Sequence, residues 1–90
     1  MTYEQNEPDF ERWLKHALTQ TNIKPSELAK IIEVDRTTVY SWLSGKKLIN
    51  DTTSRIRIAK IISHKMDLDY RDVIIEILWT CHVSEYRRSL

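Results

Sequence analysis

Residues 26–47, SELAKIIEVDRTTVYSWLSGKK, contain two short apolar patterns of helical spacing with a turn between them. The residues of the two patterns are Leu28, Ala29 and Ile32, and then Val39, Trp42 and Leu43. Apolar residues that recur every three or four positions indicate one buried face of a helix. Asp35 stands where an N-cap carboxylate accepts a backbone N–H, and Gly45 suits a left-handed helix end. The stretch therefore predicts two short helices joined by a tight turn at Glu33 and Val34.

The exposed face of the second predicted helix lacks the Glu and Lys side chains that are usual on a solvated helix. It carries Arg36, Thr37, Tyr40 and Ser41, and two lysines follow the glycine. Guanidinium and hydroxyl groups can hydrogen-bond to the edges of bases, and ammonium groups attract phosphate. This residue set favours a polyanion as the partner of this face.

Three further helices are predicted around this pair, at residues 8–21, 51–65 and 69–83 or beyond. Pro8 suits a first helical position, and Asn22 suits a left-handed terminator. Asn50 or Asp51 is expected to cap the fourth helix and Asp69 the fifth. Residues 1–7 and 84–90 are predicted to be frayed, which leaves a core of about residues 8–83 in a single domain. The predicted fold is all-α, with five helices in residues 1–90.

Composition agrees with one globular helical domain. The chain has 90 residues, 41% of them hydrophobic and 30% charged, with one glycine and two prolines. So few turn-forming residues favour helices over a strand-rich fold. The net charge is +1, but residues 12–60 hold ten Lys or Arg against four Asp or Glu, which concentrates positive charge around residues 26–47.

The sequence predicts no metal site, cofactor or membrane segment. Cys81 is the single cysteine, and the three histidines lack metal-ligand spacing. The longest apolar stretch, residues 73–83, is interrupted by Glu76 and is too short for a membrane span. The acidic N-terminus does not resemble a signal peptide. We expect a cytoplasmic, nucleoid-associated protein.

The pattern of residues 26–47 resembles the helix-turn-helix of the lambda-repressor-like, Cro-like (XRE) family, whose pattern is close to eLA..lgvs..tvs.We.Gk. The resemblance extends through the five-helix plan over about residues 9–80. It implies a compact DNA-binding domain whose second and third helices form the helix-turn-helix. It also implies that the third helix enters the DNA major groove with its N-terminal end first.

The resemblance assigns base contacts to the third helix. The implied base-reading residues are Arg36, Thr37 and Ser41, with Asp35, Thr38 and Tyr40 at the margin. Arg36 could donate two hydrogen bonds to a guanine, and Thr37 could contact a thymine methyl group.

Phosphate contacts are implied on both sides of that helix. The implied residues are Lys24, Ser44, Gly45, Lys46 and Lys47, with Thr52, Thr53 and Arg55 as weaker candidates. Lys24 would act with the N-terminal end of the second helix, and the others would follow the sugar-phosphate backbone.

The chain departs from the family pattern in three places. Glu33 stands where the family most often has glycine, so we expect it in a left-handed conformation, at a cost of order 1 kcal/mol. Pro25 replaces a glutamine that commonly holds a phosphate, which predicts a weaker clamp. Leu18 and Leu43 stand where the family often has a buried Arg–Glu pair, and an apolar pair can replace it without loss of stability.

The fifth predicted helix has more apolar residues than one buried stripe requires. The surplus is expected around Ile75 and Trp79, with Tyr86 added if the helix continues. A homodimer through this helix would place two third helices one DNA turn apart, about 34 Å, on a palindromic site. The alternative is that all of these residues pack internally. Ile31 is also apolar where the pattern expects an exposed polar residue.

These observations predict a dimeric, sequence-specific regulator of transcription, most simply a repressor of bacterial or phage type. The alternative is an antitoxin or antirepressor that binds a protein partner through its C-terminal helix. An enzyme is not predicted, because the sequence contains no nucleophile–base set, paired-carboxylate site or glycine-rich phosphate loop.

Overall fold

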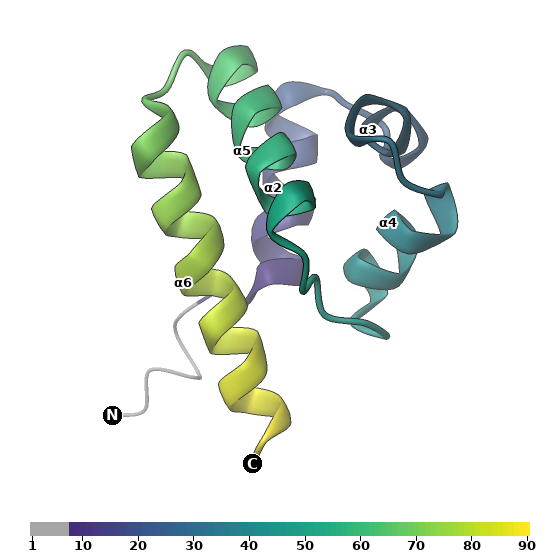
Figure 1. Cartoon of the computed structure of the whole chain (residues 1–90), viewed down its shortest axis with the longest axis vertical. Helices are drawn as coiled ribbons and strands as arrows, with labels where there is room; N and C mark the ends of the chain where they lie inside the picture. Colours follow the sequence, from purple (N-terminus) through teal and green to yellow (C-terminus); the bar gives the residue numbers. More distant parts are fainter. Residues whose placement is uncertain (1–7) are drawn as a thin grey trace.

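A computed structural model describes residues 8–90, which form five α-helices and no β-strand (Figure 1). The helices are α2 (Phe10–Thr21), α3 (Pro25–Ile32), α4 (Arg36–Ser44), α5 (Thr52–Met66) and α6 (Tyr70–Arg88). The predicted all-helical class and the five helices are thus confirmed. The predicted fraying of residues 1–7 lies outside the described residues. Within residues 8–90, no helix is both long enough and apolar enough to cross a membrane.

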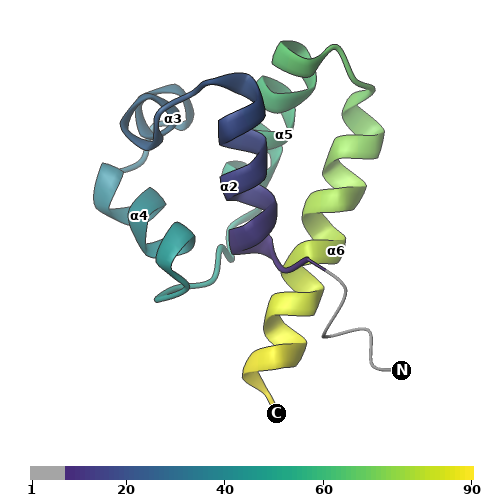
Figure 2. The same ribbon diagram turned by 180° about the vertical axis from the view of Figure 1, so that it is seen from behind.

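Helices α2 and α5 form the centre of the molecule. Each packs against α6 on one side, while α2 also packs against α4 and α5 against α3 (Figures 1 and 2). Helices α3 and α4 pack against each other and lie on the side away from α6. The most deeply buried side chains come from all five helices: Leu14, Leu28, Ile32, Val39, Ile58, Ile62, Val73, Ile77 and Val83. One apolar core therefore holds all the helices together.

The ends of the helices follow local side-chain chemistry. Asp9 caps α2, its carboxylate accepting the Arg12 N–H at 3.0 Å, so the predicted start at Pro8 is wrong by two residues. Asp69 caps α6 in the same way, as predicted, and of the two candidates for α5, Asn50 and Asp51, it is Asp51 that caps the helix. Each such cap stabilises its helix by about 1 kcal/mol, because it satisfies an N–H that the helix leaves free.

The C-terminal residues correct the prediction that residues 84–90 are frayed. Helix α6 continues to Arg88, and its last turns are anchored to the start of α2. The Ser84 hydroxyl accepts the Phe10 N–H at 2.9 Å, and the Arg87 guanidinium contacts the Asp9 carboxylate at 3.0 Å. Ser84 is buried, and these contacts hold the helix beyond Val83.

Candidate nucleic-acid interface

The turn between α3 and α4 has the geometry expected from the sequence. Glu33 is left-handed, with φ 62° and ψ 49°, and its N–H reaches the carbonyls of Ala29 and Lys30. The Val34 N–H donates to the Ala29 carbonyl at 3.0 Å, and the Arg57 guanidinium donates to the Ile32 carbonyl at 2.9 Å. Three of the last carbonyls of α3, those of Ala29, Lys30 and Ile32, are thereby satisfied, which stabilises the turn into α4.

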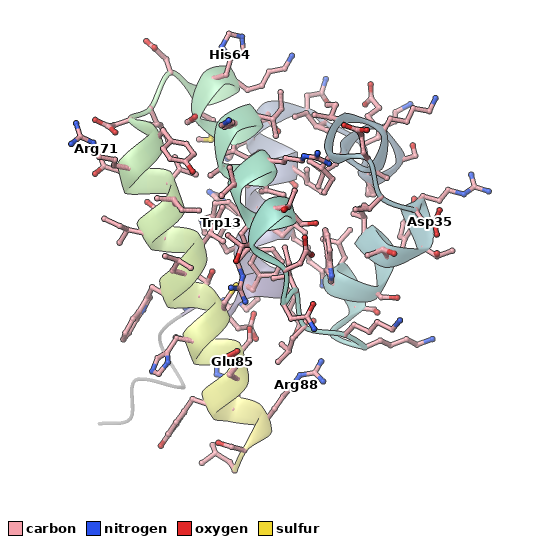
Figure 3. All side chains as sticks on the ribbon, in the orientation of Figure 1. Trp13, Asp35, His64, Arg71, Glu85 and Arg88 are labelled. Carbon is pink, nitrogen blue, oxygen red and sulfur yellow. The ribbon has the colours of Figure 1, made fainter. Side chains whose placement is uncertain are left out.

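Asp35 caps α4 with its backbone only. Its backbone is extended, and its carbonyl accepts the Thr38 N–H at 3.0 Å. The predicted bond from an α4 N–H to its carboxylate is absent, which corrects the sequence analysis. The side chain is exposed, so water can solvate the charge instead. Figure 3 shows Asp35 at the outer end of α4, on the side of the molecule opposite α6.

Two buried side chains anchor the inner face of α4. Val39 and Trp42 belong to the core, and the rings of Trp42 and Phe10 meet edge to face with centroids 6.4 Å apart. Helix α4 has only nine residues, so these anchors fix which of its side chains point outward.

The outer face of α4 forms a shallow hollow of about 420 Å³. Its lining comprises Arg36, Thr37, Tyr40, Ser41, Ser44 and Lys46. Four of the six predicted base-facing residues and two of the predicted phosphate contacts are thus brought together. Of the other two, Asp35 precedes the helix, and Thr38 lies on the flank of α4, in another hollow that Lys47 and Asn50 share.

Two of the four hydroxyl groups in this hollow donate to the helix backbone. The Ser41 hydroxyl donates to the Thr37 carbonyl at 2.9 Å, and the Ser44 hydroxyl donates to the Ser41 carbonyl at 3.3 Å. With its hydrogen engaged, a hydroxyl group keeps its acceptor capacity, which suits a donor such as a base amino group. Arg36 is exposed and supplies the donors that these hydroxyls lack.

The loop after α4 is held by contacts from helices that are distant in sequence. Gly45 has φ 78°, and a Cβ atom at this position would lie 2.6 Å from the Glu11 carboxylate. The Arg88 guanidinium donates a hydrogen bond to the Gly45 carbonyl, and Figure 3 shows Arg88 at the end of α6 nearest this loop. Lys46 and Lys47 remain exposed. The sequence pattern did not indicate the roles of Glu11 and Arg88, because both contacts join residues far apart in the chain.

Lys24 and Pro25 form the entrance to α3. The Lys24 N–H donates to the Glu27 carboxylate at 2.9 Å, so this backbone donor is already engaged. Both residues border an apolar hollow that Leu18 and Leu43 also line, at the position where the family often has an ion pair. The Lys24 side chain is exposed, and it stays the predicted phosphate donor at this end of α3.

The three candidates on α5 differ in exposure. Thr52 and Thr53 are exposed at the first turn. Arg55 points inward: its Nη2 donates to the Ile49 carbonyl at 3.0 Å, and its Nε is buried without a hydrogen-bond partner. Burial raises the pKa of the adjacent Cys81 thiol, and Arg55 opposes this rise. This placement argues against the predicted phosphate contact by Arg55.

Helix α6 exposes large apolar side chains on its outer face. The exposed fractions are 62% for Ile75, 45% for Trp79 and 37% for Tyr86, the three predicted interface residues. Leu78, which the sequence analysis did not single out, is 49% exposed on the same helix. The Trp79 ring also lies 5.5 Å from the His82 ring. Internal packing, the alternative, accounts for the opposite face, where Val73 and Ile77 are buried.

The described residues contain no cluster of three or more His, Cys, Asp or Glu side chains that could hold a metal ion. What they do contain is a cationic, hydroxyl-rich helix face and, on another helix, an apolar one. No protein-family model matches the chain, and comparison with curated proteins and with solved structures gave no significant match.

Proposed function

We propose that this protein binds double-stranded DNA as a sequence-specific regulator of transcription, with α3 and α4 as a lambda-repressor-like helix-turn-helix. The single observation that carries this proposal is the hollow on the outer face of α4, which gathers one guanidinium, one ammonium and four hydroxyl groups. A helix that inserts into the major groove needs such donors and acceptors along its exposed face. The left-handed Glu33 supports the proposed motif, because it is the conformation that the family's glycine adopts.

The residues divide into base and phosphate contacts. Arg36 reads a guanine through two hydrogen bonds, while Thr37 and Ser41 read neighbouring base edges. Lys46 and Lys47 follow the phosphates on one side of the groove, and Ser44 and Thr52 support them. Lys24 contacts phosphate on the other side of α4.

The protein acts as a homodimer joined through α6. Ile75, Leu78 and Trp79 expose an apolar surface on α6, and this helix lies across the core from α4 (Figure 1). A two-fold axis at this surface would allow two copies of α4 to enter successive major grooves of a palindromic operator. A repressor of this kind acts by occluding a promoter.

The second candidate function is an antitoxin or antirepressor that uses the same α6 surface to bind a different protein. The observation that favours it is the size of the exposed apolar side chains on α6. Such a partner would compete with the homodimer, so the oligomeric state of the free protein separates the two candidates.

The test is selection of binding sites from random duplexes with the full-length protein, followed by binding measurements over a range of salt concentrations. We expect a palindromic site and a steep linear fall of log K with log salt concentration. Lys46→Ala should weaken binding to all sequences alike and reduce that slope by about one. Arg71→Ala is the matched control, because Arg71 is exposed at the far end of α6 (Figure 3). Failure to enrich any site would refute the proposal.

A further inference from the structure

A separate hollow, of about 320 Å³, lies between α3 and α5. It is lined by Ile31 from α3 and by Arg57, Lys60, Ile61 and His64 from α5. None of these residues lines the hollow on the outer face of α4. Figure 3 shows His64 at the C-terminal end of α5 and Asp35 at the start of α4.

The floor of this hollow is apolar, although the core does not need an apolar side chain at this position. Ile31 is 45% exposed, at the position of α3 where helical spacing predicts a polar residue. Its neighbours in the chain show that the inner face of α3 is complete, because Leu28 and Ile32 are fully buried. Ile61 is half-buried and extends the apolar surface across to α5. Stability of the fold therefore does not explain the isoleucine at position 31.

The rim of the hollow is basic. Lys60 and His64 are exposed, and no Asp or Glu side chain of the described residues lines the hollow. The Glu33 carboxylate, which does not line the hollow, lies 3.7 Å from the Arg57 guanidinium. Arg57 is further held by its hydrogen bond to the Ile32 carbonyl, so its position is fixed before any partner arrives. The result is a small apolar floor with cations around it.

We infer that this hollow docks an acidic, amphipathic segment of another protein. An apolar side chain of the segment lies between Ile31 and Ile61, and its carboxylates face Lys60 and Arg57. Charge complementarity identifies the partner, because a cationic rim selects acidic residues and repels basic ones. A nucleic acid fits less well, because an exposed isoleucine in the centre offers no hydrogen bond to a phosphate or a base edge. This inference is independent of DNA binding by α4.

The test uses a random 12-residue peptide library displayed on phage and panned against the full-length protein. Peptides that also bind the double variant Ile31→Gln/Lys60→Glu are removed at each round. Both side chains are exposed, so the variant should fold, and circular dichroism checks this. The best peptide is then titrated into ¹⁵N-labelled protein, and each single variant is measured separately.

We expect enriched peptides to carry net negative charge and at least one large apolar residue. Their binding should shift the amide signals of Ile31, Ile61 and His64, and each substitution should weaken it at least fivefold. Lys46→Ala, the control on α4, should leave peptide binding unchanged while it weakens DNA binding. The inference is overturned if no peptide depends on Ile31 and Lys60, or if the enriched peptides are not acidic. It is also overturned if a mixed-sequence DNA duplex or a second copy of the protein, instead of the peptide, causes those shifts.

Discussion

Helices α4 and α6 distribute their side chains in opposite ways. Helix α4 has nine residues, buries Val39 and Trp42, and exposes a guanidinium and several hydroxyl groups. Helix α6 has 19 residues, buries Val73 and Ile77, and also exposes large apolar side chains. Burial of one face is the same in both, so the exposed face distinguishes them. A polar, cationic exposed face suits a hydrated polyanion, whereas an apolar exposed face suits another protein surface.

The two helices are nevertheless connected at one point. The last turn of α6 reaches the loop after α4 through Arg88 and the Gly45 carbonyl, while Arg87 reaches Asp9 at the start of α2. The loop that carries Lys46 and Lys47 is therefore held by the same helix that exposes Ile75 and Trp79. Substitutions on the inner and outer faces of each helix test the difference between α4 and α6, and substitutions of Arg87 and Arg88 test this connection.

The largest effect is expected on the inner face of α4. Trp42→Ala removes a buried indole that packs on Phe10, and it should lower the free energy of unfolding by about 3–5 kcal/mol. Tyr40→Ala, on the outer face of the same helix, should change it by no more than about 0.5 kcal/mol, because Tyr40 is 52% exposed. Urea denaturation followed by circular dichroism measures both. Equal losses in the two variants would contradict the assigned faces of α4.

A matched pair on α6 separates folding from association. Ile77→Ala should lower the free energy of unfolding by about 2–5 kcal/mol, because Ile77 is fully buried. Ile75→Ala, two positions earlier, should leave that energy within about 0.5 kcal/mol when measured on the monomer, but it should weaken self-association. Analytical ultracentrifugation at tens of micromolar protein measures the association. A purely monomeric wild-type protein under these conditions would refute the proposed dimer.

Much of this arrangement follows from local patterns in the sequence. Apolar spacing located all five helices, and the caps were expected at Asp69 and at Asn50 or Asp51. The left-handed Glu33 was expected from the resemblance to the family pattern, which most often has glycine there. The errors arose where distant segments decide the outcome. Residues 84–88 are helical because Ser84 and Arg87 contact the start of α2. Such contacts have no local signature, because they depend on how the helices pack.

The outer face of α4 is tested by the loss of one guanidinium. Arg36→Ala should weaken binding to the selected duplex by about 1–3 kcal/mol and relax specificity at one base pair, because a bidentate contact to guanine is lost. The free energy of unfolding should not change, since Arg36 is exposed. Fluorescence anisotropy with the selected duplex and single-base variants of it measures the effect. A uniform loss across all the duplexes would instead identify Arg36 as a phosphate contact.

The connection between α6 and α2 should have a moderate effect. The Asp9 and Arg87 side chains are mostly buried, with 13% and 24% exposed, and their charged atoms lie 3.0 Å apart. Arg87→Ala leaves the Asp9 carboxylate without this partner and should lower the free energy of unfolding by about 1–3 kcal/mol. Arg88→Ala is the matched control on the exposed side of the same turn. We expect it to change stability by less than about 1 kcal/mol, and to weaken DNA binding if the Gly45 loop contacts phosphate.

The smallest effect is expected at Cys81, on the inner face of α6. Its pKa is raised because burial disfavours the thiolate, and the Arg55 guanidinium only partly offsets this. The folded thiol therefore keeps its proton at a higher pH than the unfolded one. The stability that the buried, protonated thiol contributes is fully present below the pKa of the unfolded thiol. It is lost as pH rises through the raised pKa of the folded state. The free energy of unfolding between pH 8 and pH 10 should fall more in the wild type than in Cys81→Ala.

Iodoacetamide should also react several-fold more slowly with the native protein than with the protein in urea. Equal reaction rates would mean that the thiol is accessible in the native protein because this part of α6 opens readily. The inner face of α6 would then be less protected from solvent than its buried side chains indicate.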